Sequence, residues 1–247
     1  MSSTKTDIYE DLRSKWKNVL IDNNLLEEQV KITARSLSPE QALGNPKDKD
    51  YALLKGKESL TEAVFKGAAG QAYSSSESSF CGSLSQVLEM PLRNSKEITI
   101  FIAALNATMR YLRLIPASEH CKNEQPQLCA RELTAYLKNY CHQVNPKINL
   151  VGFQPRMAEA LEANFPLRIN DLDRENRGKK VGKVFVEGED STSENLEWCD
   201  LALVTGTVLT NRTIPIFMDN KKIIYYGTTI SGTSRLLKLS WFCPLST

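Results

Sequence analysis

The second half of the chain predicts an α/β fold with a mainly parallel sheet. After residue 147, short apolar runs that are typical of buried strands alternate with stretches that are typical of amphipathic helices. Strands and helices that alternate at this spacing indicate a doubly wound parallel sheet. The expected strands cover residues 148–153, 167–169, 181–186, 201–204 and 223–226, and the expected helices begin near 157, lie between 208 and 218, and cover 236–239.

The first half of the chain shows a different pattern. Residues 8–20 and 98–112 carry apolar side chains at three- and four-residue spacing, which predicts two helices, the second apolar enough to join two domains. Residues 57–69 predict a further helix, and residues 30–34 alternate as a half-buried strand does. The serine tract at 74–79 predicts a surface loop of the kind that borders binding sites.

Length and composition limit the classes of protein that fit. A chain of 247 residues holds two domains at about 100–200 residues each. The net charge of +2 argues against nucleic acid as a partner, because nucleic-acid-binding proteins carry a clustered basic excess. No apolar stretch approaches the length of a membrane span, and the N-terminal residues lack the apolar region of a signal peptide, so we expect a cytoplasmic protein.

Residues 119–129 concentrate metal-binding side chains more than any other segment. One of the two histidines, His120, lies directly before Cys121, and Glu124 follows three residues later. Imidazole, thiolate and carboxylate groups together can form a transition-metal site. A reduced cytoplasmic protein keeps its six cysteines free to act as ligands, although the absence of a CxxC pair excludes a zinc ribbon.

Two further cysteines bear on this metal-site hypothesis. Pro126 can start a helix that places Cys129 on an apolar stripe, so we expect Cys129 to be a core side chain. Cys243, near the end of the chain, either completes a metal site with Cys121 or fills an apolar gap.

The ends of the predicted parallel strands form a second candidate site. Ligands bind at the carboxyl ends of such strands, and small or hydroxylated residues there allow close backbone approach, although threonine also caps helices. Asp171 lies 19 residues after Gly152, near the position of a ribose-binding acid, but the further glycines of the dinucleotide fingerprint are missing, so no NAD is expected. The expected ligand-binding residues here are Gly152, Gln154, Asp171, Thr205, Gly206, Thr207, Gly227 and Thr228.

An ordered series of short motifs runs through nearly the whole chain. The motifs are GNP (44–46), LLKGKE (53–58), GQAY (70–73), LNA (105–107), HC (120–121), WCD (198–200), VTGT (204–207), YGT (226–228) and FCP (242–244). With these motifs the chain resembles the heavy-metal-chelation family, an uncharacterised family that pairs an enolase N-terminal-like domain with a Rossmann-like domain. Asn211-Arg212 departs from the family pattern, where a smaller residue follows the asparagine, and the serine tract is looser than in the family.

The resemblance implies an architecture and a place for the site. It implies a small enolase N-terminal-like α+β domain over residues 1–94 and a Rossmann-like three-layer domain with a mainly parallel sheet over residues 95–247. The functional site is then the cleft between the domains, with a link to metal handling such as metal-containing cofactor or siderophore metabolism. Enolase activity does not follow, since the chain has no room for the enolase barrel.

The leading functional hypothesis is a protein that binds a heavy-metal ion or a metal chelate in that cleft. His120, Cys121, Glu124 and Cys243 are the candidate metal ligands, and the metal is a transition metal such as zinc, iron, cobalt or nickel. In this hypothesis an organic ligand is oriented by Gln71, Asn106, Thr205 and Thr228. Symmetric dimers are common, so a homodimer is compatible with the sequence.

Two alternatives remain open at the level of sequence. The first is an enzyme that acts on a phosphorylated or carboxylated small molecule at the strand ends, with Cys121 or Asp171 doing proton or nucleophilic work. The second is a structural or regulatory module whose cleft has no ligand. No familiar hydrolase or phosphate-loop motif assigns a catalytic residue.

Overall fold

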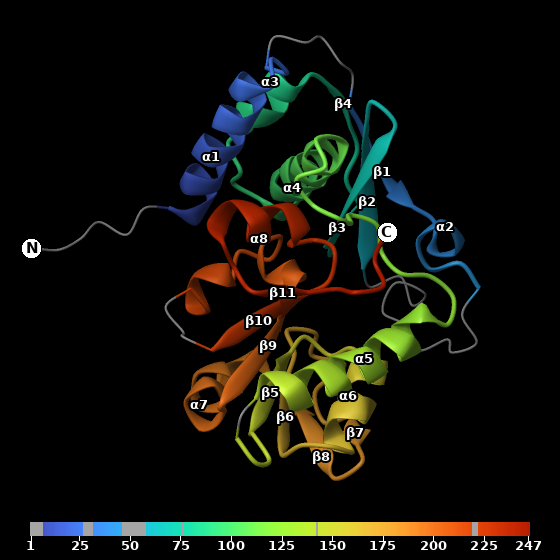
Figure 1. The fold of residues 1–247 in the computed structure, drawn as a ribbon, viewed down its shortest axis with the longest axis vertical. Helices are drawn as coiled ribbons and strands as arrows, with labels where there is room; N and C mark the ends of the chain where they lie inside the picture. Colours follow the sequence, from blue (N-terminus) through green and yellow to red (C-terminus); the bar gives the residue numbers. More distant parts are fainter. Residues whose placement is uncertain (1–6, 27–31, 46–57, 76, 142, 219–221) are drawn as a thin grey trace, which may run out of the picture.

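The computed structural model describes residues 7–26, 32–45, 58–75, 77–141, 143–218 and 222–247 and contains two sheets (Figure 1). The larger sheet has seven strands in the order β11-β10-β9-β5-β6-β8-β7, and every pairing except β7 with β8 is parallel. The predicted α/β class with a mainly parallel sheet is therefore confirmed. Its strands are β5 (Ile148–Val151), β6 (Leu167–Asn170), β7 (Lys180–Val181), β8 (Val184–Glu187), β9 (Leu201–Thr205), β10 (Ile223–Tyr226) and β11 (Trp241–Phe242).

Helices cover the larger sheet at most of the expected places. Pro126 and Pro155 lie in the first turns of α5 and α6, where a missing N–H costs no hydrogen bond. The helix expected between 208 and 218 is replaced by two short 3-10 turns, because Arg212 has a left-handed φ angle of 61° and Pro215 lacks the N–H that a helix interior needs. The elements are α5 (Gln125–Tyr140), α6 (Pro155–Glu162), η2 (Glu189–Ser191), α7 (Thr192–Trp198), η3 (Gly206–Val208), η4 (Ile214–Ile216) and α8 (Ser231–Leu237).

The smaller sheet is antiparallel, with strand order β3-β2-β1-β4. Residues 32–34 of the expected strand belong to β1, and residues 30–31 lie outside the described residues. The elements are α1 (Ile8–Asp22), β1 (Ile32–Leu37), α2 (Pro39–Leu43), β2 (Ser59–Phe65), β3 (Ala68–Ser74), β4 (Phe80–Gly82), α3 (Leu84–Leu88) and α4 (Ser95–Tyr111).

The helix expected over residues 57–69 is wrong, because the β2–β3 hairpin occupies this segment. Lys66 and Gly67 lie between the strands with φ angles of 48° and 84°. Two consecutive left-handed residues are the signature of the hairpin turn whose twist matches paired strands. The register closes tightly around that turn, with Phe65 opposite Ala68. The backbone of the turn therefore overrides the three- and four-residue spacing of the apolar side chains.

Helix α4 packs against the smaller sheet and is buried along most of its length. It packs against β2 and β3 on one side and against α8 on another (Figure 1). Trp16 of α1 packs edge-on against Phe101 and donates a hydrogen bond to Thr108 Oγ1 at 2.9 Å. The helix thus connects both halves of the fold, while the domain boundary at 94/95 stays a prediction.

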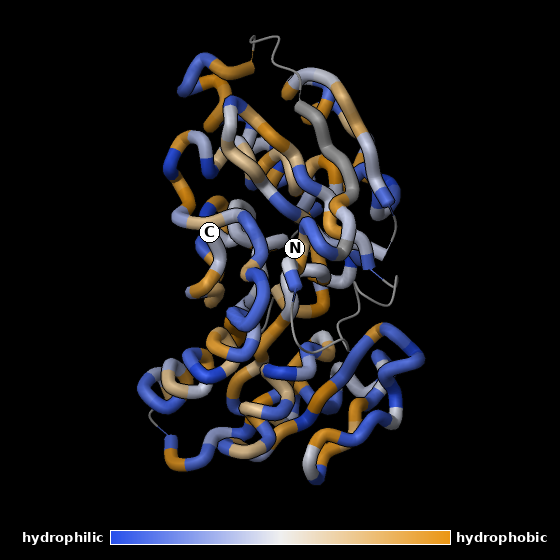
Figure 2. Tube along the Cα trace, turned by 90° about the vertical axis from the view of Figure 1, so that its right-hand side faces the viewer, coloured by the Kyte–Doolittle hydropathy of each residue, from blue (hydrophilic) through white to orange (hydrophobic). Residues whose placement is uncertain are grey.

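Hydrophobic stretches along the trace are short and broken by hydrophilic residues (Figure 2). The long apolar helix α4 has 17 residues, fewer than the roughly 20 that span a bilayer. Within the described ranges, no helix combines the length and the apolar character that a membrane crossing needs.

The backbones of β3 and α4 meet at Gly70. A Cβ atom at this position would lie 2.0 Å from the Ala107 nitrogen and 2.5 Å from the Ala103 oxygen. Backbone atoms of a buried helix cannot move aside as a flexible side chain can. The smallest side chain therefore separates the strand from the helix.

We expect Gly70→Ala to lower the free energy of unfolding by about 1–3 kcal/mol, the usual cost of overpacking. Urea titration followed by circular dichroism measures this change. Gly67→Asn is the matched control, because open space surrounds Gly67 and asparagine tolerates the left-handed backbone. Equal stability of Gly70→Ala and the wild type would contradict the close contact.

Candidate functional site

A cavity of about 940 Å³ lies at the carboxyl ends of β5, β6, β9 and β10. Its volume suits a bound small molecule, since such pockets span about 300–1,000 Å³. The structure brings the expected strand-end residues together here, because parallel strands end at one edge of a sheet. The lining includes Gly152, Gln154, Asp171, Thr205, Gly206, Thr207, Gly227 and Thr228. Ser74 and Ser75 of the serine tract border it as well, and residue 76 lies outside the described residues.

His120 lies on another wall of the same cavity, before α5. Its backbone N–H donates to Gln71 Oε1 at 2.7 Å, and its ring packs edge-on against Tyr73 with 5.4 Å between ring centroids. The Nδ1 atom is buried and has no hydrogen-bond partner. Burial lowers the pKa of His120 to about 4, so the imidazole is neutral at pH 7 and keeps a lone pair for a metal ion.

Three thiols from separate segments line the cavity with His120: Cys121, Cys129 and Cys243. Burial raises the pKa of Cys121 to about 12, and the charge of Cys243 adds to this effect. Burial, followed by the charges of Cys243 and Cys121, also raises the pKa of Cys129. The three sulfur atoms are therefore close enough to interact electrostatically, and all three are protonated when no cation is near.

Cys129 is buried in the core, as its place on the stripe of α5 predicts, and it also borders the cavity. The apolar stripe alone does not predict this second property. Cys129 lies in the first turns of α5, which begins four residues after Cys121. This proximity of the helix start to the His120-Cys121 segment was the available signal.

The chain around Cys243 returns to the His120 segment. The backbone N–H groups of Ser118 and Glu119 both donate to the Thr247 oxygen, at 2.9 and 2.8 Å, and the Thr247 N–H donates to the Glu119 oxygen at 3.1 Å. These bonds tie the segment after β11 to the residues directly before His120. The pairing fixes the relative positions of Cys243 and His120.

Three of the predicted site residues do not line the cavity. Glu124 forms the N-terminal cap position of α5. Gln71 is buried, where its Nε2 donates to Glu62 Oε2 at 2.9 Å while its Oε1 accepts the His120 N–H. Asn106 is buried in α4, and its side chain bonds backbone groups of the protein. Gln71 and Asn106 thus hold the walls of the cavity in place.

Asn106 makes four hydrogen bonds to three segments. Its Nδ2 donates to the carbonyl oxygens of Gln71, Thr228 and Thr229 at 2.9, 3.2 and 3.1 Å. Its Oδ1 accepts the Gly232 N–H at 2.9 Å. One amide therefore connects α4 to β3 and to the loop between β10 and α8.

Asp171 connects two of the strand-end loops. One carboxylate oxygen accepts the Phe153 N–H, and the other accepts the Asp173 N–H at 2.7 Å and Asn176 Nδ2 at 3.2 Å. Desolvation and the charges of Asp171 and Asp173 raise the pKa of Glu58, on the rim of the cavity, to about 7. These three acidic side chains therefore lie near one another.

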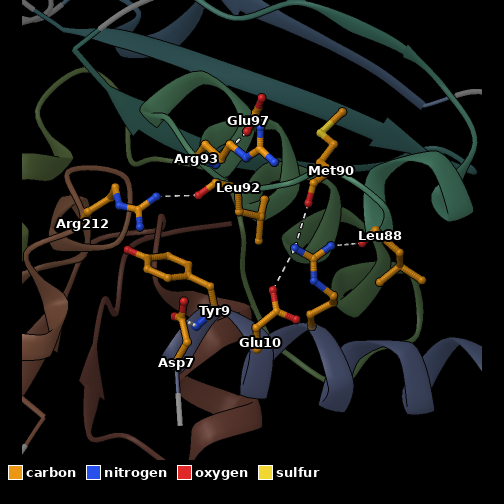
Figure 3. Close-up of polar contacts among 10 residues, drawn as sticks. Asp7, Tyr9, Glu10, Leu88, Met90, Leu92, Arg93, Glu97 and Arg212 are labelled. Atoms are coloured by element: carbon orange, nitrogen blue, oxygen red, sulfur yellow. Dashed lines mark hydrogen bonds and ion pairs between the residues drawn. The ribbon is translucent and has the colours of Figure 1, made fainter. Parts of the chain in front are cut away.

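Acidic side chains outnumber basic ones among the described residues that line the cavity. Six acidic side chains line it, namely Glu58, Asp171, Asp173, Glu175, Glu189 and Asp190, against the single arginine Arg212. Asp190 also pairs with Arg177 at 3.1 Å. Arg212 donates to the Leu92 oxygen at 2.6 Å and stacks over the Tyr9 ring, as Figure 3 shows. The field in the cavity favours a cation.

The described residues contain no group of three or more His, Cys, Asp or Glu side chains that could hold a metal ion by themselves. His120 and the thiols supply suitable donor atoms on one wall. They do not form a closed coordination shell of the kind that structural zinc sites have.

We expect Asn106→Asp to lower the free energy of unfolding by about 3 kcal/mol or more. Aspartate keeps an oxygen for the Gly232 N–H but turns a carboxylate towards three carbonyl oxygens, and each unpaired buried group costs about 1–3 kcal/mol. Asn94→Asp is the control, because Asn94 caps α4 through its oxygen and aspartate caps equally well. Equal urea midpoints for the two variants would contradict the role of Asn106.

Glu58 makes stability depend on pH. The folded protein holds this proton up to about pH 7, whereas the ordinary pKa is 4.5. The free energy of unfolding of the wild type should therefore fall, relative to Glu58→Gln, as the pH rises from about 4.5 to about 7. Urea unfolding of both proteins across this range tests the sign, and a constant difference would contradict it.

Comparison with known proteins finds a family model that matches part of the chain. A family model described as "Putative heavy-metal chelation" (DUF364) matches residues 141–236. No curated protein matches the chain. Two of the motifs that carry the resemblance are described only in part, because residue 46 of GNP and residues 53–57 of LLKGKE lie outside the described residues.

Two solved structures of DUF364 proteins of unknown function share the fold. One, from Pyrococcus horikoshii, is 14% identical with a TM-score of 0.53, and the match covers 92% of this chain and 83% of that chain. The other, from Desulfitobacterium hafniense, is 16% identical with a TM-score of 0.52 and covers 92% and 82%. The resemblance found in the sequence is thus confirmed over residues 141–236, which match the heavy-metal-chelation family model.

Proposed function

We propose that the protein binds a transition metal, as an ion or within a complex, in the cavity at the strand ends. The observation that carries this proposal is the lining of the cavity, which includes the neighbours His120 and Cys121 together with Cys243 from a distant part of the chain. The family description supports metal binding in general. We propose both the individual metal ligands and the position of the site in a cleft between the two predicted domains.

The donor atoms on this wall fit a soft or borderline metal ion. A neutral imidazole and thiols bind zinc, iron, cobalt, nickel or copper(I) more readily than magnesium or calcium. A metal ion displaces the thiol protons when it binds, so the protonated thiols of the metal-free protein are compatible with a ligand role. Cys129 is a third thiol within reach of the same wall, whereas Glu124 lies outside the cavity.

An enzyme acting on a phosphorylated or carboxylated molecule has less support. Such an anion would face six acidic side chains, and the single lining arginine is already bound to the Leu92 oxygen. The predicted cytoplasmic location, the homodimer and the absence of a nucleic-acid partner stay predictions.

Elemental analysis by inductively coupled plasma mass spectrometry tests the metal ligands. We expect protein purified without air or chelators to carry about one equivalent of a single transition metal. His120→Ala/Cys121→Ser and Cys243→Ser should each weaken binding of added Co²⁺ at least tenfold, because each removes a proposed ligand. Loss of the thiolate-to-cobalt absorption band reports the sulfur ligands directly.

Cys81→Ser is the matched control for the cysteine variants. Cys81 is an exposed cysteine on β4 and does not line the cavity. This variant should bind Co²⁺ as the wild type does. Full metal content in His120→Ala/Cys121→Ser would show that the ligand set is wrong.

A further inference from the structure

We propose that the cavity takes its metal as a cationic complex whose own ligands carry N–H or O–H groups, and that the strand-end wall around Asn170 and Thr228 recognises those groups. This inference rests on the proposed function and adds the chemical class of the ligand. Asn170 ends β6, and Thr228 follows β10, so both lie on the wall formed by the strand ends.

The size of the cavity and the number of donors indicate a complex. A bare ion bound only by side chains needs a compact shell of about four donors, and no group of even three occurs among the described residues. A cavity of about 940 Å³ holds far more than one ion. A metal complex whose own ligands supply most of the donors fits both observations.

Asn170 and Thr228 offer acceptors that the protein leaves unused. Their side chains are 3% and 1% exposed, and Asn170 Oδ1 and Thr228 Oγ1 have no hydrogen-bond partner. The amide donor of Asn170 is already used, since its Nδ2 donates to Thr192 Oγ1 at 3.0 Å. Buried polar atoms without a partner are rare in native proteins and cost free energy. A ligand that donates hydrogen bonds would satisfy both oxygens.

The charge of the same wall selects a cation. Glu58, Asp171 and Asp173 line the cavity near Asn170, and Arg212 is held by the Leu92 oxygen and the Tyr9 ring (Figure 3). An amine complex of a metal ion combines positive charge with N–H donors. A citrate complex carries negative charge and offers mainly carboxylate oxygens, which accept hydrogen bonds, so this wall would repel it.

Apolar side chains complete the lining and favour an organic part in the ligand. Phe153, Val208 and Phe217 border the cavity together with Met157. Such surface binds the carbon skeleton of a chelating amine, as apolar linings do in other small-molecule sites.

Hexaamminecobalt(III) is a probe that tests binding at the strand-end wall without involving the thiols. It is an inert trivalent cation whose six ammine ligands donate N–H groups, and it exposes no position for a thiolate. Isothermal titration calorimetry should show binding to the wild type and equal binding to His120→Ala/Cys121→Ser. Thr228→Val should weaken binding about fivefold, the value of one neutral hydrogen bond.

Thr61→Val is the matched control for Thr228→Val. Thr61 is also fully buried with an unpartnered hydroxyl, but it lies on β2 and does not line the cavity. Thr61→Val should bind the probe as the wild type does. Neither valine variant should melt below the wild type when no ligand is present, since each removes an unsatisfied hydroxyl.

The outcomes separate this inference from the proposed function. No binding of hexaamminecobalt(III) by the wild type, or wild-type affinity in both Thr228→Val and Asn170→Ala, would overturn the inference. Wild-type Co²⁺ binding by His120→Ala/Cys121→Ser would instead overturn the proposed function, in which His120 and Cys121 are metal ligands. In the wild type, the triethylenetetramine complex of Ni²⁺ should bind more tightly than its citrate complex, and the reverse order would also overturn the inference.

Discussion

The buried amide of Asn106 is the constraint on which the site depends. From the middle of α4 it satisfies backbone groups of β3, of the turn after β10 and of the first residues of α8. These segments are far apart in sequence, and each one either lines the cavity or lies directly beside a residue that lines it. Because a buried amide loses much when any partner moves, the bonds fix the distance between the two sheets.

Strand β3 connects Asn106 to the cavity wall that carries His120. Gln71 receives a bond from Asn106 through its carbonyl oxygen and holds the His120 N–H through its side chain. Two residues along, the Tyr73 N–H donates to Thr229 Oγ1 at 3.0 Å and its carbonyl oxygen accepts from Thr210. Strand β3, at the edge of the small sheet, therefore contacts both the wall with His120 and the wall formed by the strand ends.

Much of the large sheet could be predicted from sequence, because its buried strands are short apolar runs bounded by glycine or polar residues. The strand-end residues followed from topology, since parallel strands end at one edge. The hairpin at Lys66-Gly67 could not, because the apolar spacing around it fits a helix and only the backbone of the turn decides. The 3-10 turns around Pro215 were missed for a similar local reason.

The site itself was predicted in part. Strand-end residues, His120, Cys121 and Cys243 meet in one cavity, but Gln71 and Asn106 turned out to bond the protein's own backbone. A polar residue in a sequence motif gives no sign of whether its partner is a ligand or a distant carbonyl group. The acidic character of the cavity was also invisible, because the net charge of +2 averages over residues that the fold separates.

One hydrophobic cluster runs from Tyr9 to Ile230 and includes side chains from both halves of the chain. Helix α1 packs against α8, although more than 200 residues separate Tyr9 from the start of that helix. During synthesis the apolar stripe of Leu12 and Trp16 is made long before all of its partners. The nascent chain therefore carries this apolar surface exposed until α8 has been made, and exposed surface of this kind is what chaperones protect from aggregation.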